Sequence, residues 1–130
     1  MTGRDRIIIQ KVFGYIKDII SYTEGYTFDN FMSDKKTISA CAFSIGQIGE
    51  LAGNINADIR EEYPDIPWRS IKGMRNKIVH DYENVDLAVL WGTIQNSLPQ
   101  LAAQLENILE QQANNLDESQ DEEIGGMNMS

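Results

Sequence analysis

Residues 66–82 hold the side chains with the clearest capacity for chemistry. They include His80, the only histidine of the chain, and four of its eleven basic residues, and Tyr82 follows two positions later. Histidine, with an unperturbed pKa of about 6.5, suits general acid–base catalysis at neutral pH. Arginine is permanently charged, and its forked guanidinium matches phosphoryl oxygens. Arg75 and His80 therefore form a minimal pair for chemistry on a phosphodiester.

RNA is the phosphodiester that this pair suits best. RNA carries its own nucleophile, the ribose 2′-hydroxyl, so a base and a positive charge can cleave it without a metal ion or other cofactor. The expected product is a 2′,3′-cyclic phosphate, and DNA, which lacks the hydroxyl, should not be cut. This route needs both a base and an acid, and the chain supplies a single histidine.

Helical periodicity arranges the segment into two faces. At about 100° per residue, one stripe is apolar and should be buried; it comprises Ile71, Met74, Ile78 and Tyr82. The opposite face is polar and carries His80, with Arg75 at its flank. Asn76 either orients a phosphate or ribose or is only a surface residue. Arg69, Lys72 and Lys77 either guide an RNA backbone or form a solvated helix face.

The motif resembles a known family. Four residues separate Arg75 from His80, and one separates His80 from Tyr82. This spacing resembles the signature of HEPN-domain proteins, specifically the HepT-like toxins of HEPN and minimal-nucleotidyltransferase toxin–antitoxin pairs (type II or VII). The match extends through Ile-Pro-Trp-Arg before the motif, Gly-Met-Arg-Asn-Lys-Ile-Val-His across it, and Val-Asp-Leu and Trp-x-Thr-Ile-Gln-Asn-x-Leu-Pro after it. The resemblance covers nearly all of the chain up to about Gln112.

This resemblance implies a metal-independent endoribonuclease with Arg75 and His80 as its catalytic residues. It also implies a two-fold homodimer, which would bring two copies of each residue to one cleft and supply the missing acid. The matching tyrosine is the one to which the cognate nucleotidyltransferase antitoxin attaches AMP, so Tyr82 is the expected AMPylation site; a core tyrosine is the other reading. AMP there would add bulk and negative charge where RNA phosphate should lie.

Two other functions compete with this one. The first is a non-catalytic helical module that docks a nucleotidyltransferase partner, which an RNA cleavage assay without added metal would distinguish. The second is a helical transcription regulator, which is disfavoured by the net charge of −9 and the lack of a recognisable recognition helix.

Apolar residues at steps of three and four predict an all-α protein, an antiparallel bundle of four to five helices. The expected helices cover 4–23, 38–59, 67–82 and a last long helix capped by Asp86 and kinked at Pro99, with a short turn or one-turn helix at 27–33. Residues 1–112 should form one domain and 113–130 an acidic disordered tail.

The predicted helix 38–59 carries two further features. Ala42, Gly46, Gly49 and Gly53 form a line of small residues beside its apolar stripe. Since glycine costs about 1 kcal/mol in a helix interior, this line indicates close approach of another backbone, either within the bundle or at a subunit interface. Glu50 lies nearly opposite the stripe and is either a solvated acid or an auxiliary acid that reaches toward Arg75.

Composition restricts the setting. Five acids and no Lys or Arg occur from Asp117 onward, so the rest of the chain carries −9 + 5 = −4 and can still hold basic patches. The single cysteine excludes an intramolecular disulfide, and no metal-ligand spacing of Cys and His appears. With no signal-peptide pattern and no membrane-length apolar run, we expect a cytoplasmic protein without a metal site.

Overall fold

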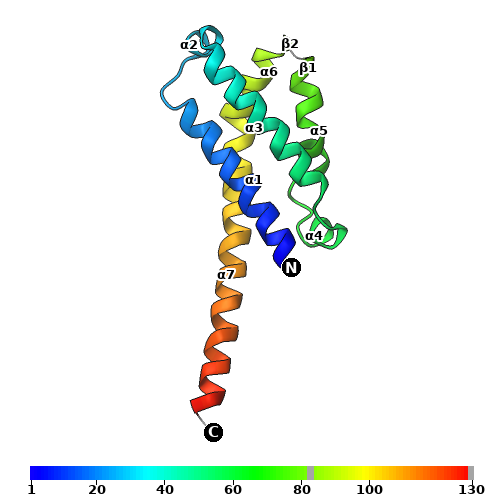
Figure 1. The fold of residues 1–130 in the computed structure, drawn as a ribbon, viewed down its shortest axis with the longest axis vertical. Coiled ribbons are helices and arrows are strands. Elements are labelled where there is room, and N and C mark those ends of the chain that lie inside the picture. The colour runs from blue at the N-terminus through cyan, green and yellow to red at the C-terminus, as the bar shows by residue number, and fades with distance from the viewer. Residues whose placement is uncertain (82–83, 129–130) are drawn as a thin grey trace.

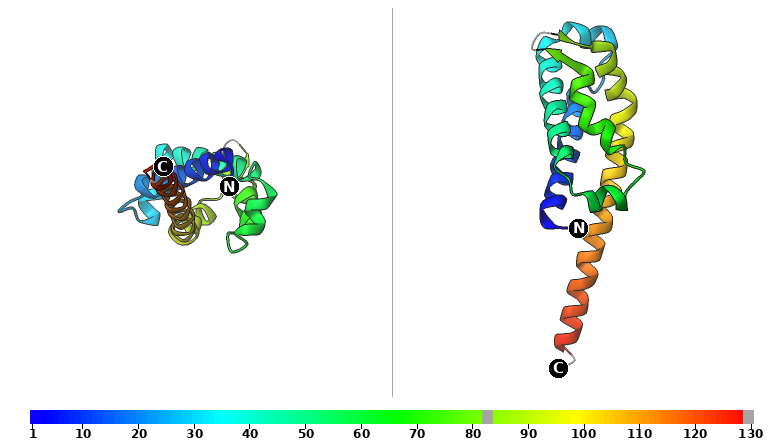
Figure 2. Two further views of the ribbon diagram at one scale, coloured as in Figure 1. Left: turned by 90° about the horizontal axis from the view of Figure 1, so that it is seen from below. Right: turned by 90° about the vertical axis from the view of Figure 1, so that its right-hand side faces the viewer.

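The computed structural model describes the backbone of residues 1–81 and 84–128 and the side chains of residues 1–79 and 84–115. Its long elements are α1 (Gly3–Tyr22), α3 (Lys35–Gly53), α5 (Trp68–Ile78) and a column of α6 (Leu87–Gly92), η1 (Thr93–Ser97) and α7 (Leu98–Asn128). Two short helices, α2 (Phe28–Ser33) and α4 (Ala57–Glu62), complete the helical part. The predicted helical fold is thereby confirmed, and Figures 1 and 2 show α3 lying between α1 and α5.

The core lies where α3 meets α1 and α5 and where α1 meets α7. The predicted apolar stripes supply it: the buried side chains include Ile8, Val12, Ile16 and Ile19 of α1, Cys41, Ile45 and Ile48 of α3, Ile71 and Ile78 of α5, and Leu98, Leu101, Leu105 and Ile108 of the last column. Phe31 of α2 is fully buried and packs at 5.1 Å, ring centre to ring centre, on Trp91. Burial of this apolar surface is the main stabilising term.

A buried carboxylate joins α1 to the turn after α3. Asp5 accepts hydrogen bonds from the Asn56 backbone N–H at 3.2 Å, from the Asn56 amide at 2.8 Å and from the Thr2 hydroxyl at 2.9 Å. Burial opposes ionisation of Asp5, but these hydrogen bonds and Arg4 outweigh it and lower the pKa of the carboxyl. The two chain segments are 51 residues apart, so this contact fixes where α3 ends relative to the start of α1.

A second carboxylate begins α3. Asp34 caps the helix by accepting from the Thr37 backbone N–H at 3.1 Å, and it also accepts from the hydroxyls of Tyr26 at 2.6 Å and Thr37 at 2.7 Å. The Tyr26 hydrogen bond, followed by those of Thr37, lowers the pKa of Asp34 from 3.8 to about 2. The hydrogen bonds that join the preceding turn to α3 are therefore stronger when the Asp34 carboxyl is ionised.

The expected single helix over 38–59 is wrong. α3 ends at Gly53, and α4 begins at Ala57. Between them, the side-chain amide of Asn54 donates to the Glu50 carbonyl at 3.2 Å. Ile55 and Ile59 nevertheless remain buried, at 3% exposure each, because the turn returns them to the same core. The apolar period in the sequence therefore continues across the turn between α3 and α4 and does not predict where the helix is interrupted.

The motif helix also ends earlier than expected. α5 stops at Ile78, and Val79–Asp81 forms β1, which pairs antiparallel with β2 (Asn84–Val85). The Asp86 N–H donates to the Ile78 carbonyl at 2.8 Å and so closes the backbone there. This short β-ladder corrects two predictions. The helix does not continue to Tyr82, and the fold contains a pair of short strands.

The last helical column confirms one prediction and extends another. Asp86 caps α6 by accepting from the Val89 N–H at 3.1 Å. The segment before Pro99 widens into the π-helix η1, which the sequence pattern did not predict, and the kink at Pro99 stays a prediction. α7 continues to Asn128 and projects past the rest of the bundle (Figure 1), although its apolar period ends near Gln112. The domain boundary at residue 112 stays a prediction. No helix of the described residues is long and apolar enough to cross a membrane.

Candidate active site between α3 and α5

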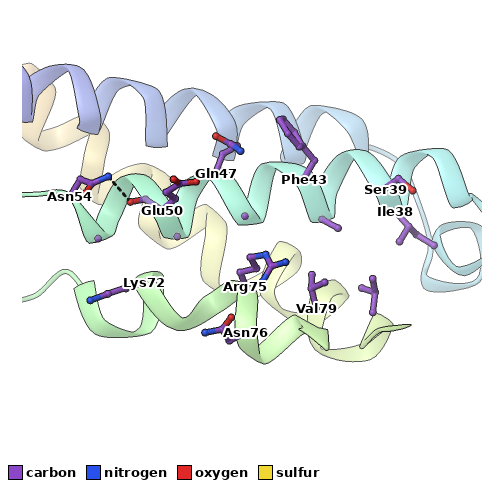
Figure 3. A pocket seen from close by; sticks show the side chains of 15 residues that line it. Ile38, Ser39, Phe43, Gln47, Glu50, Asn54, Lys72, Arg75, Asn76 and Val79 are labelled. Carbon is purple, nitrogen blue, oxygen red and sulfur yellow. Dashed lines mark hydrogen bonds between the residues drawn. The ribbon is translucent and has the colours of Figure 1, made fainter. Parts of the chain in front are cut away.

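A groove of about 890 Å³ runs along the surface between α3 and α5. One part of its lining is polar: Gln47 and Glu50 of α3, Asn54 directly after α3, and Lys72, Arg75 and Asn76 of α5 (Figure 3). The other part is mostly apolar and comprises Ile38, Ala42, Phe43, Val79 and Val85. The groove therefore combines cations and amides with apolar surface, a composition suited to a ligand that is charged in one part and flat in another.

Glycines of α3 allow α5 to lie this close. A Cβ at Gly49 would stand 3.2 Å from the Lys72 carbonyl oxygen and 3.5 Å from that of Ile71. A Cβ at Gly46 would touch Arg75 Cδ at 3.6 Å. The small-residue line predicted from the sequence thus packs within the bundle, which is the first of its two interpretations, and the long side chains of α5 lie over it.

The structure brings several predicted site residues into this groove. Arg75, Lys72 and Asn76 line it from α5, and Glu50 lines it from α3. Gly53 supports Lys72, whose Cε lies 3.6 Å from the Cβ position there. The groove therefore contains part of the polar face that was expected opposite the apolar stripe, and the roles of these residues stay predictions.

The other two predicted cations lie elsewhere. Arg69 lines a neighbouring hollow with Arg60. Lys77 lines a third hollow, on the side of α5 that meets η1 and α7. A single RNA contact surface that included all of these basic residues would have to wrap around α5, so their common role stays a prediction.

The structure describes only the backbone of His80. It places this residue in β1, directly after Val79, and Val79 lines the groove. The helical-wheel relation of His80 to Arg75 and Asn76 no longer applies, since β1 replaces the last helical turn. Tyr82 lies outside the described residues.

Sequence reasoning missed one prominent residue of the groove. Phe43 is 62% exposed, the most exposed large hydrophobic side chain among those whose burial is described. An exposed aromatic ring is a surface on which an unpaired nucleobase can stack, and Figure 3 shows this ring on the side of α3 turned away from α5. The available signal was an aromatic residue on α3 out of phase with the stripe of Cys41, Ile45 and Ile48, on a face that should have been polar.

The groove offers charge and hydrogen bonding rather than a metal-ligand set. Arg75 has five N–H donors in a fixed fork, Lys72 adds a mobile ammonium, and the Asn76 amide both donates and accepts. Among the side chains of 1–79 and 84–115, no cluster of three or more His, Cys, Asp or Glu could hold a metal ion. These groups are suited to binding the oxygens of a phosphate.

These features define a helical-bundle protein with a cationic groove that leads to a histidine-bearing strand. Comparison with known proteins then gives the family. The family model described as "Ribonuclease HepT-like" matches residues 12–108. The chain therefore belongs to the HepT-like ribonuclease family.

Individual relatives agree with this assignment. A protein of Thermococcus cleftensis named "Probable ribonuclease HepT" is 38% identical over 93 residues, which cover 72% of this chain and 84% of the relative. A protein of Methanocaldococcus jannaschii named as an RNase is 33% identical over 104 residues, which cover 80% and 86%. Another protein named as an RNase, from Caldanaerobacter subterraneus, is 33% identical over 94 residues, which cover 72% and 84%. No solved structure gives a significant match.

Proposed function

We propose that this chain is the toxin of a cytoplasmic toxin–antitoxin pair and an endoribonuclease that works without a metal ion. The observation that carries the proposal is the position of Arg75 in a groove that is also lined by Val79, the residue next to His80. Membership of the ribonuclease family supports the same substrate.

The proposed reaction is a transesterification. His80 removes the proton from a ribose 2′-hydroxyl, and the 2′-oxygen attacks the adjacent phosphorus while the bond from phosphorus to the 5′-oxygen breaks. Arg75 binds the phosphoryl oxygens and stabilises the charge that grows on them. The 5′-oxygen leaves with a proton, and the other product ends in a 2′,3′-cyclic phosphate.

A homodimer completes this scheme. A second copy of the chain, related by a two-fold axis, would bring a second His80 to protonate the leaving oxygen. In this scheme Asn76 orients a phosphate or ribose, and its position in the lining of the groove supports this role. Glu50, on the opposite wall, is the proposed auxiliary acid.

Silencing by a nucleotidyltransferase antitoxin is also part of the proposal. AMP joined to Tyr82 through a phosphodiester would carry negative charge next to the proposed base and compete with substrate phosphate for the cations of the groove. Mass spectrometry after incubation with the cognate antitoxin and ATP tests this step. Full neutralisation with Tyr82 unmodified would overturn it.

The cleavage itself is tested with purified protein, a single-stranded RNA and excess EDTA. His80→Ala and Arg75→Ala should abolish cleavage, and Arg75→Lys should retain little because it keeps the charge but loses the fork. Lys11→Ala, an exposed cation of α1, is the matched control and should cut like the wild type. Cleavage by both alanine variants at the wild-type rate would refute the proposal. A wild-type chain that binds the antitoxin but cuts no RNA would indicate the non-catalytic binding module instead.

A further inference from the structure

A second cationic hollow adjoins the groove at the start of α5. It has a volume of about 500 Å³, and Arg60 of α4 and Arg69 and Lys72 of α5 line it. The other described residues that line it are Ala52, Ile66, Pro67, Trp68 and Ser70, so none of the described lining residues is acidic. Three cations around one hollow are a marked local excess in a chain of net charge −9.

The structure holds both arginines near this hollow. A guanidinium nitrogen of Arg60 donates to the Ile55 carbonyl at 3.2 Å, which ties the side chain to the turn between α3 and α4. The Trp68 indole N–H donates to the Tyr63 carbonyl at 3.0 Å and fixes the start of α5, where Arg69 follows. The α4 acids Asp58, Glu61 and Glu62 are not among the lining residues.

Lys72 connects the hollow to the groove because it lines both. Arg69, Lys72 and Arg75 are spaced three residues apart, so they form one inclined row on the surface of α5. At 1.5 Å per residue the row extends about 9 Å along the helix axis. Stacked nucleotides rise about 3.4 Å each along one strand, so the row spans two to three nucleotides.

We propose that the Arg60–Arg69 hollow is a second phosphate subsite, which binds the RNA backbone two to three nucleotides from the scissile phosphate. The inference rests on the proposed function, since it takes the groove around Arg75 as the place of cleavage. The row of cations follows the path of a polyanion with regular spacing, and the arginine forks match phosphate oxygens. The enzyme should therefore need a single-stranded RNA that extends beyond the two nucleotides joined by the scissile phosphate.

Salt dependence of binding tests the subsite without any cleavage. The ligand is a single-stranded 12-nucleotide RNA with 2′-O-methyl groups, which cannot react through the 2′-oxygen. Each phosphate contact contributes about 0.7 to the slope of log K against log salt for single strands. The Arg60→Gln/Arg69→Ala variant should therefore lower the magnitude of the slope by about 1.4. Between 50 and 200 mM salt, its affinity disadvantage relative to wild type should shrink by about sevenfold.

A matched control separates the subsite from a general loss of positive charge. Lys11→Gln/Lys17→Gln removes two exposed cations of α1 and changes the net charge equally. This control should keep the wild-type slope. An unchanged slope in the Arg60/Arg69 variant, or an equal change in the control, would overturn the proposal and leave the hollow to another ligand, such as an acidic surface of a protein partner. Urea unfolding of each variant shows whether the fold is intact, and Arg69→Ala alone, which keeps the Arg60 hydrogen bond, should give half of the effect.

Substrate length distinguishes a failure of the subsite from a failure of the proposed reaction. A dinucleotide has one phosphate, which must occupy the cleavage site, so its kcat/KM should be the same for wild type and the Arg60/Arg69 variant. Cleavage of a 12-nucleotide RNA should fall in the variant. If wild type cuts neither RNA but the slopes differ as expected, the proposed reaction fails and the subsite stands. If both RNAs are cut and the variant loses nothing on the longer one, the subsite fails alone.

Discussion

The close approach of α3 and α5 depends on Gly49, and substitution of this residue by alanine tests it. Gly49 is buried, and its Cβ would meet the backbone carbonyl oxygens of Lys72 and Ile71 at 3.2 and 3.5 Å. Backbone cannot rotate away as a side chain can, so α5 must shift by a few tenths of an ångström. At Gly46 the Cβ would meet only Arg75 Cδ and Nε, at 3.6 and 3.8 Å, which is ordinary contact.

The two alanine variants should therefore differ in stability. Alanine gains about 1 kcal/mol of helix propensity over glycine at either site, and neither glycine has a positive φ. Overpacking at Gly49 costs about 1–3 kcal/mol. Gly46→Ala should then be neutral or up to about 1 kcal/mol more stable than wild type, and Gly49→Ala about 1–3 kcal/mol less stable than Gly46→Ala.

Urea unfolding followed by tryptophan fluorescence measures this difference, since Trp68 and Trp91 lie on two elements of the bundle. With a slope of about 1–3 kcal/mol per molar urea, the two midpoints should be separated by roughly 1 M. Equal midpoints, or a higher midpoint for Gly49→Ala, would show that α5 does not lie against the α3 backbone at this position. The groove would then not have the walls described above.

Three further predictions concern buried or capped groups. Asp34→Asn should make the free energy of unfolding depend less on pH between pH 5 and pH 2. The Asp34 carboxyl, whose pKa is lowered to about 2, stabilises the fold above its unfolded pKa of about 4, and this contribution is lost as the pH falls toward 2. Circular dichroism from pH 5 to pH 2 would follow the difference. The Cys41 thiol, whose pKa burial raises to about 11, should be inert to thiol reagents at pH 8 until the chain is unfolded; labelling of the native protein would contradict its burial. Asn56→Ala removes the 2.8 Å side-chain hydrogen bond to buried Asp5 but keeps the one from the backbone N–H, and it should cost about 1–3 kcal/mol by thermal unfolding, whereas the same change at exposed Asn54 should cost less.

Local signals predicted the helices well. The segment 4–23 was expected as a helix and is one at Gly3–Tyr22, because steps of three and four in its isoleucines and valine report a buried face directly. The cap at Asp86 was predictable for the same reason, since its partner N–H is three residues away. The bundle thus follows from patterns within about two helical turns.

The misplaced boundaries depended on contacts between distant residues. The apolar period runs through Gly53 into Ile55 and Ile59, and the partner of the intervening turn is Asp5, which is 51 residues away from Asn56. Past Ile78 the helical period continues in sequence, but pairing with Asn84–Val85 ends the helix. Local periodicity carries no information about either partner.

The candidate site was predictable only in part. The helical wheel of α5 placed Lys72 and Asn76 on one face with Arg75 at its flank, and all three line the groove, whereas Arg69 lines another hollow. Phe43 and Arg60 were missed since their relation to that row comes from the packing of α3 and α4 against α5. Cooperation between elements is a tertiary property, and no single periodicity reports it.

The small residues of α3 link the fold to the proposed chemistry, and a larger side chain at Gly46 tests the link. Any atom beyond Cβ there would enter the space of the Arg75 side chain, whose Cδ lies 3.6 Å from the Cβ position. Gly46 lines an open groove, so Gly46→Leu should fold but displace the guanidinium. Misplacement of a catalytic group by about 1 Å can cost about 100-fold in rate.

RNA cleavage by Gly46→Leu should therefore approach the loss seen with Arg75→Ala, while its urea midpoint stays close to that of wild type. Gly14→Leu on α1, where nothing lies within 4 Å of the Cβ position, is the matched control and should retain activity. A fully active Gly46→Leu beside an inactive Arg75→Ala would mean that Arg75 acts from a position that α3 does not set. The arginine would then be positioned by other parts of the chain or by a second protomer, and the α3–α5 groove would not be the place where the phosphate is bound.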